Sequence, residues 1–140
     1  MESKLHIGID PDCDRSGFSV YRVGERKITH LECLDLIDLM DRIRLLHQGI
    51  NIKVYLEAGW LLKATWHKGG VGMAKRVGSN HEIGRQLEKF LIKESIPYQL
   101  ILPQGYSSFT HDRFCKITGW PANVKTNSEK RVAGMLVYGR

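Results

Sequence analysis

Short runs in which apolar and polar residues alternate open the chain and predict strands. Residues 5–9 form the first run, which stops at Asp10-Pro11. Residues 19–23 and 27–31 form two more runs, joined by a short turn that contains Gly24. Because the connections are short, these three segments predict an antiparallel meander of three strands.

Apolar residues at helical spacing follow, and they predict helices that alternate with two further strands. The first stripe is capped by Asp35 and consists of Leu36, Leu39, Met40, Ile43 and Leu46. The second stripe ends before Pro97 and consists of Ile83, Leu87, Phe90 and Leu91. Strands are predicted over 52–56 and 98–102, and helices over 112–118 and 127–138. Residues 58–75 have no clear period and contain four glycines, so no regular element is predicted there.

The order of elements, βββ-α-β-α-β-α, predicts an α/β fold. We expect a five-stranded mixed sheet, with a three-strand antiparallel meander and two strands parallel to the first, flanked by helices. No internal repeat, low-complexity tract or linker divides the chain, so a single domain over 1–140 is expected.

Composition narrows the class of protein without changing this fold. With 140 residues, 42% of them hydrophobic and 26% charged, the chain is long enough for one domain with its own core. No apolar run reaches the length of a membrane span, and the first residues lack the apolar stretch of a signal peptide. Three widely spaced cysteines exclude a disulfide scaffold and a CxxC zinc site. We therefore expect a cytoplasmic protein with no membrane partner.

Charge is distributed unevenly along the chain. Residues 1–57 carry 8 Lys/Arg against 10 Asp/Glu, whereas residues 58–140 carry 13 against 5. A strongly basic half favours a polyanionic partner, of which nucleic acid is the commonest. A mildly basic surface that serves solubility alone is the alternative.

Two carboxylates stand where predicted neighbouring strands end. Asp10 follows the first strand and Glu57 follows the fourth, which is expected to run parallel to the first. Ligands gather at the carboxyl ends of parallel strands, so these two groups are expected to lie close together. Paired carboxylates repel each other unless a cation neutralises them, and hard oxygen ligands select Mg²⁺ or Mn²⁺. The alternative is that both acids close their strands because acidic residues favour turns.

Several motifs resemble those of RuvC-type Holliday junction resolvases in the RNase H-like superfamily. Residues 7–11 (IGIDP) and 16–20 (SGFSV) are similar to the opening motif of the family, and 54–57 (VYLE) matches the second motif in position. Residues 80–90 are similar to the helix that follows the catalytic glutamate. The ordered set covers nearly the whole chain and resembles a compact RuvC-like group of bacteria and their phages.

This resemblance implies a cytosolic, Mg²⁺-dependent endonuclease that cuts branched DNA, usually as a homodimer. It implies Asp10, Glu57 and Glu129 as catalytic metal ligands, with Lys116 and Lys125 near the scissile phosphate to offset charge. The family places a second acid three residues after the position of Glu129, and this chain has Val132 there. Asp12 and Asn127 are the alternative sources of a fourth ligand, although neither occupies the matching position.

A set of basic and aromatic residues is expected to contact DNA. Basic residues interleaved with aromatic ones hold phosphates while the rings stack or wedge against bases. The set consists of Trp60, Lys63, Trp66, Lys68, Lys75, Arg76, Arg85 and Phe109. The alternatives are that the tryptophans pack the 58–75 segment onto the sheet and that Lys116 and Lys125 are ordinary surface lysines.

Three functions from different classes remain open on the sequence. The first is a structure-specific DNA endonuclease, and the second is a DNA-binding module on the same fold with weakened cleavage because of Val132. The third is a protein-interaction domain, against which the basic half argues. No GxSxG or GxxxxGK[ST] motif occurs, so a serine hydrolase and a P-loop enzyme are excluded. The second helix either lends its outer side to a dimer or is wholly used in the core.

Overall fold

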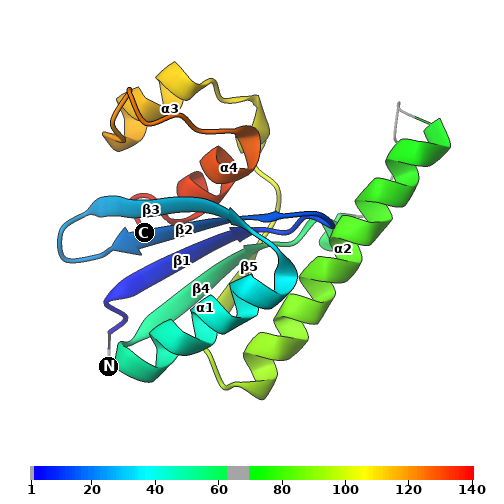
Figure 1. Ribbon diagram of the computed structural model, residues 1–140, viewed down its shortest axis with the longest axis horizontal. Helices are drawn as coiled ribbons and strands as arrows, with labels where there is room; N and C mark the ends of the chain where they lie inside the picture. Colours follow the sequence, from blue (N-terminus) through cyan, green and yellow to red (C-terminus); the bar gives the residue numbers. More distant parts are fainter. Residues whose placement is uncertain (1, 63–69) are drawn as a thin grey trace.

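The computed structural model describes residues 2–62 and 70–140, and its strands form one mixed sheet of order β3-β2-β1-β4-β5 (Figure 1). The strands are β1 (Leu5–Asp10), β2 (Ser16–Arg22), β3 (Lys27–Leu34), β4 (Ile52–Glu57) and β5 (Tyr98–Ile101). β1, β2 and β3 pair antiparallel, whereas β4 runs parallel to β1 and β5 parallel to β4. The predicted α/β fold is confirmed.

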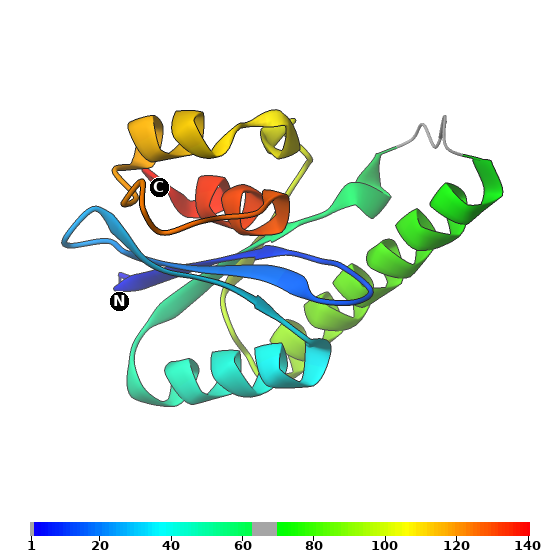
Figure 2. The same ribbon diagram turned by 45° about the horizontal axis from the view of Figure 1, so that its top comes forward.

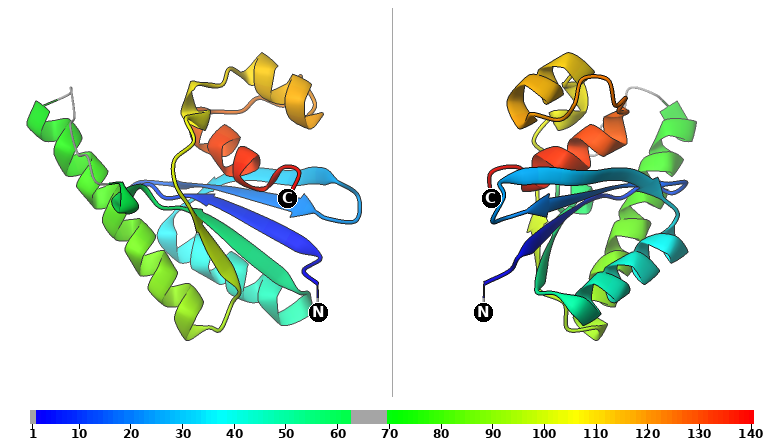
Figure 3. Two further views of the ribbon diagram at one scale, coloured as in Figure 1. Left: turned by 180° about the vertical axis from the view of Figure 1, so that it is seen from behind. Right: turned by 60° about the vertical axis from the view of Figure 1, so that its left-hand side comes forward.

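Helices cover both faces of the sheet, as Figures 1 and 2 show. One face carries α1 (Leu36–Gly49) and α2 (Gly70–Lys93), and the other carries α3 (His111–Thr118) and α4 (Ser128–Val137). Short 3₁₀ helices η1 (Gly59–Leu61) and η2 (Tyr106–Ser108) follow β4 and β5. Seen from behind and from the side in Figure 3, α4 lies directly on the sheet and α2 extends beyond the sheet edge.

Successive side chains along each strand point to opposite faces of the sheet, so they pack into two separate cores. The core under α1 and α2 is aliphatic, and its fully buried members include Ile7, Ile9, Val54 and Leu56. The core under α3 and α4 contains more aromatic residues, among them Tyr21, Tyr55 and Phe114. Burial of apolar area in these two cores is the main stabilising contribution to the fold.

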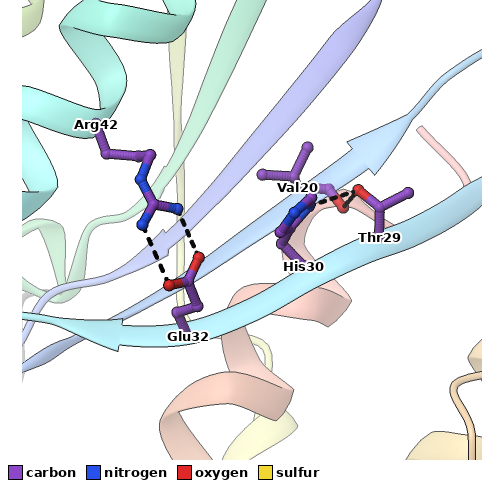
Figure 4. A network of polar contacts seen from close by, with 5 residues as sticks. All are labelled: Val20, Thr29, His30, Glu32 and Arg42. Carbon is purple, nitrogen blue, oxygen red and sulfur yellow. Dashed lines mark hydrogen bonds and ion pairs between the residues drawn. The ribbon is translucent and has the colours of Figure 1, made fainter.

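An ion pair fastens α1 to β3 at the edge of the sheet (Figure 4). The guanidinium of Arg42 donates two hydrogen bonds to the carboxylate of Glu32, at 2.6 and 3.2 Å. This bidentate contact with Arg42 lowers the pKa of Glu32 below its ordinary value. Nearby, the register of the β2–β3 pair shifts between Val20 and Tyr21, and the Thr29 hydroxyl donates to the Val20 carbonyl there, as Figure 4 also shows.

Local capping signals in the sequence agree with the structure. The Asp35 side chain accepts a hydrogen bond from the Asp38 N–H and caps α1, as predicted. Asn127 caps α4 in the same way through the N–H of Lys130. Within the described ranges, no helix is long and apolar enough to cross a bilayer.

The prediction that residues 58–75 lack regular structure was wrong in part. η1 occupies Gly59–Leu61, and α2 already begins at Gly70. The early turns of α2 reach past the sheet edge, and most of residues 74–79 are exposed. Because that part of the helix has no layer to pack against, it carries no apolar stripe from which a helix could be predicted.

Candidate active site

The ends of β1 and β4 place two carboxyl groups side by side. These strands are parallel neighbours, with Ile9 aligned to Leu56, so Asp10 and Glu57 are the next residues on adjacent strands. Both side chains are half-buried and line the same cleft, which has a volume of about 270 Å³. The expectation that the two acids would meet at the carboxyl end of the sheet therefore agrees with the geometry.

A close approach between α4 and the sheet fixes the position of Glu129. A Cβ atom added at Gly8 would collide with the carbonyl oxygen of Ala133, and one added at Gly17 would collide with the backbone of Glu129. The Ser19 hydroxyl donates to the Ala133 carbonyl at 2.7 Å. Only glycine permits such backbone contact, so Gly8 and Gly17 set how near the start of α4 lies to β1 and β2.

Burial is the main influence on the protonation of the two cleft carboxyls. Burial, together with the smaller effects of the charges on Glu57, Glu129 and Asp12, raises the pKa of Asp10 to about 8. Burial raises the pKa of Glu57 to about 7. Among the described residues, every charge that acts on Asp10 is itself a carboxylate. The site thus brings carboxyl groups together, and the pKa values of two of them lie at or above neutral pH.

One wall of the cleft comes from the first half of α2. The Asn80 side-chain oxygen accepts a hydrogen bond from the Cys13 N–H at 2.7 Å, which ties α2 to the loop that follows Asp10. One turn further, the ring of Trp60 lies directly against Gly84 and joins η1 to α2. These contacts bring the loop after β1 and the segment after β4 onto the same stretch of helix.

His81 is a residue of this wall that the sequence reasoning missed. It lines the cleft with Asp10 and Glu57, and its imidazole lies beside Gly59. The available signal was helical spacing, because residues 77, 80, 81 and 84 fall on one face of a helix. That face carries few apolar residues, so the hydrophobic period did not reveal it.

Trp60 and Phe109 are engaged within the protein itself. Trp60 is half-buried and packs against the aliphatic core as well as against Gly84. The Phe109 ring has Tyr106 edge-on at 5.5 Å and the Arg113 guanidinium 3.8 Å from its centroid. Of the two alternatives for Trp60, this placement favours packing of the segment after β4.

The basic residues named from the sequence are spread over several elements. Lys75, Arg76 and Arg85 are exposed on α2, and Arg85 lies 3.6 Å from Glu82. Lys116 and Lys125 are exposed on and after α3, and neither is among the charges that act on Asp10. Three further members of the predicted set, Lys63, Trp66 and Lys68, lie outside the described residues.

Val132, which occupies the position where the resembled family has a second acid, lies in the core under α3 and α4. Val132 is 3% exposed and belongs to the core that includes Phe114 and Leu136. The two suggested substitutes have other partners, because Asp12 accepts the Asp14 N–H and Asn127 caps α4. Neither Asp12 nor Asn127 lines the cleft.

The chemistry of the site fits a hard divalent cation held by few protein groups. Within the described ranges, no three His, Cys, Asp or Glu side chains are placed to surround one ion. Mg²⁺ commonly keeps several waters and binds through one or two carboxylates, and Asp10 and Glu57 supply such a pair. A divalent ion would also compensate the repulsion that raises the pKa of Asp10.

Comparison with known proteins supports the fold. No protein-family model matches the chain, and no curated protein matches it. Among solved structures, the chain is similar to "T. thermophilus RuvC in complex with Holliday junction substrate", with a TM-score of 0.54 and 16% sequence identity. The match covers 94% of this chain and 90% of that one. At this level of identity the likeness establishes an RNase H-like architecture.

Proposed function

We propose that this chain is a divalent-metal-dependent endonuclease that hydrolyses phosphodiester bonds in branched DNA. The observation that carries the proposal is the pair of half-buried carboxyls, Asp10 and Glu57, at the ends of adjacent parallel strands. Glu129, on the helix that glycine contacts hold against the sheet, adds a third negative charge to the same site. The likeness in fold to the RuvC structure with its junction substrate adds support.

Asp10 and Glu57 would hold the ion, with Glu129 nearby. A bound divalent ion lowers the pKa of its water and offsets charge on a phosphoryl oxygen, which is the chemistry that phosphodiester hydrolysis needs. The part of the protein is to keep the two carboxyls adjacent and to shape the cleft around them. Binding of the ion would displace the protons that Asp10 and Glu57 retain at neutral pH.

DNA is proposed as the substrate because the second half of the chain is basic. Branched DNA is proposed because the similar RuvC structure is in complex with a Holliday junction. Exposed Lys75, Arg76 and Arg85 on α2 and Lys116 on α3 provide cations for backbone phosphates. A homodimer is proposed with it, because cutting two strands symmetrically needs one site repeated by a two-fold axis. Cytoplasmic location remains part of this proposal.

The second candidate is a DNA-binding module on the same fold with little or no cleavage. The burial of Val132 favours it, because the last helix supplies Glu129 alone to the carboxylate group. Such a module would bind branched DNA without turnover.

A cleavage and binding assay on matched DNAs tests the proposal. Four-way and linear duplex DNA are incubated with the wild type and with Asp10→Asn/Glu57→Gln in Mg²⁺, and binding is measured separately in Ca²⁺. We expect the wild type to cut the four-way DNA only with Mg²⁺ and the double variant to bind but not to cut. Binding without cleavage by the wild type supports the second candidate, and absence of binding to either DNA overturns both.

A further inference from the structure

The cleft contains an imidazole in addition to its two carboxyls. His81 of α2 lines the cleft together with Asp10 and Glu57. The other described lining residues are not basic, and they are Pro11, Gly59, Trp60, Leu62, Val77, Asn80 and Pro103. Within the described lining, His81 is therefore the only side chain that combines a ring nitrogen donor with a position on the α2 wall of the site.

The imidazole has a defined place at the end of β4. A Cβ atom added at Gly59 would lie 2.8 Å from the Nε2 atom of His81 and 3.3 Å from its Cδ2 atom. Gly59 follows Glu57 by two residues, so this edge of the ring lies beside the strand end that carries the carboxyl. The absence of a side chain at Gly59 is what leaves room for the ring.

The backbone of α2 around His81 is anchored on both sides of the cleft. Its neighbour Asn80 accepts the N–H of Cys13, three residues after Asp10, at 2.7 Å. One turn later, Gly84 lies against the ring of Trp60, three residues after Glu57. A residue between two such anchors is held in fixed relation to both carboxyls, which is what a group acting on substrate requires.

We propose that His81 is a further catalytic residue that donates a ring N–H hydrogen bond to a non-bridging oxygen of the scissile phosphate. This inference rests on the proposed nuclease function. Two carboxylates and a phosphodiester are all negative, so a hydrogen-bond donor that lines the same cleft supplies the complementary interaction. The apolar lining by Pro11, Trp60 and Leu62 lowers the local dielectric constant and strengthens that hydrogen bond.

His81 keeps its proton in this role. During hydrolysis a water oxygen forms a bond to phosphorus while one P–O ester bond breaks, and the departing ester oxygen takes up the proton that the water loses. Charge on the non-bridging oxygens is stabilised meanwhile by the His81 N–H. A neutral imidazole is sufficient for this in the tautomer whose N–H faces the phosphate, with the other ring nitrogen unprotonated.

Two substitutions at His81 separate the hydrogen bond from the shape of the ring. His81→Phe retains a ring and removes the donor, whereas His81→Gln retains a donor. We expect His81→Phe to lower the cleavage rate on four-way DNA on the order of 10²-fold, the usual loss for one such donor. Affinity in Ca²⁺ and melting temperature should stay close to wild type, and His81→Gln should recover part of the rate. His30→Phe, at an exposed position on β3, is the matched control and should cut as the wild type does.

A spectroscopic measurement decides the proposal without turnover. The imidazole ¹⁵N signals of His81 are recorded in Ca²⁺ with four-way DNA, and again with DNA that carries a neutral methylphosphonate at the cut position. We expect a shift with the phosphodiester that the methylphosphonate largely abolishes. Equal signals with both DNAs, or His81→Phe that cuts as fast as the wild type, overturn the role of His81. A wild type that cuts no DNA overturns the proposed function instead, and the ¹⁵N comparison then still decides whether His81 contacts the phosphate.

Discussion

The two faces of the sheet use the same strands for different purposes. Along β1, Leu5, Ile7 and Ile9 face α1 and α2 and are at most 4% exposed. The residues that alternate with them, His6, Gly8 and Asp10, lie on the α4 side. They supply a base, space for a backbone contact and an acid. The α1–α2 face needs only close-packed aliphatic groups, which tolerate conservative exchange. The α4 face depends on particular atoms, because backbone contacts and charges there have no equivalent substitutes.

The same contrast appears between α4, which carries Glu129, and α2, which lines the cleft. α4 lies on the sheet through backbone contacts at Gly8 and Gly17, so its position is set within narrow limits. α2 is attached by side chains, through Asn80 and through the ring of Trp60 on Gly84. If this contrast holds, substitutions on the α4 face should destabilise the protein more than matched substitutions on the α1–α2 face.

The largest effect is expected from a charge placed in the α4 core. Val132→Asp puts an unpaired carboxylate beside Phe114 and Leu136 and should destabilise the protein by about 4 kcal/mol. Thermal melting with and without saturating Mg²⁺ measures it, and we expect the same loss in both. A melting temperature that Mg²⁺ restores selectively in the variant would show that position 132 faces the metal site after all.

The next largest effect is expected from a single methyl group added where α4 contacts the sheet. Gly8→Ala forces the Ala133 carbonyl away from the sheet and should cost about 3 kcal/mol. Ile9→Val removes one methyl group on the opposite face and should cost about 1 kcal/mol. Gly24→Ala, where an added Cβ meets no atom within 4 Å, is the control and should be nearly neutral. Denaturant unfolding ranks the three, and equal losses for Gly8→Ala and Ile9→Val would contradict the contrast between the faces.

The buried carboxyls give stability a particular dependence on pH. The folded-state pKa values of Asp10, about 8, and Glu57, about 7, lie above the ordinary values near 4. The folded chain therefore binds more protons than the unfolded chain between about pH 4 and 8, so stability should fall as the pH rises through that window. Asp10→Asn removes the largest part of this dependence and should be more stable than wild type by about 2 kcal/mol at pH 8.5 in chelator.

The opposite pH dependence of wild-type stability would contradict this prediction. Wild-type stability in chelator that is flat or rising from pH 5 to pH 8 would show that Asp10 is ionised there without penalty. Lys116→Asn changes an exposed residue that is not among the charges acting on Asp10, and it should leave the pH profile of melting unchanged.

The smallest effects are expected at the exposed lysines of the α4 side. Lys116→Ala and Lys125→Ala should each change stability by less than about 0.5 kcal/mol, because neither side chain is buried. If they contact DNA phosphates, each should lower affinity evenly across DNA sequences and reduce the salt dependence slightly. Binding isotherms at several salt concentrations measure this, and a loss of cleavage rate with unchanged affinity would instead place the lysine at the scissile phosphate.

The sequence by itself determined the features that depend on near neighbours along the chain. Alternating apolar residues located the strands, helical spacing located α1 and the packed half of α2, and Asp35 marked where a helix begins. The positions of Asp10 and Glu57 could also be predicted, because both directly follow buried strands that the order of elements makes parallel neighbours. Such signals are readable because period and capping are short-range properties of the backbone.

Only the tertiary structure decided which residues beyond those two strands join the site. Residues 129 and 132 share a helical spacing, yet Glu129 acts on Asp10 while Val132 lies in the core with Phe114. How closely α4 approaches the sheet depends on contacts between segments more than one hundred residues apart, such as the hydrogen bond from Ser19 to Ala133. His81 enters the cleft for a similar reason, since Gly59 and Gly84 leave space for aromatic rings from another segment. The space beside a glycine can be recognised only when the residue that fills it is also placed. No pattern along the chain therefore predicts such a contact.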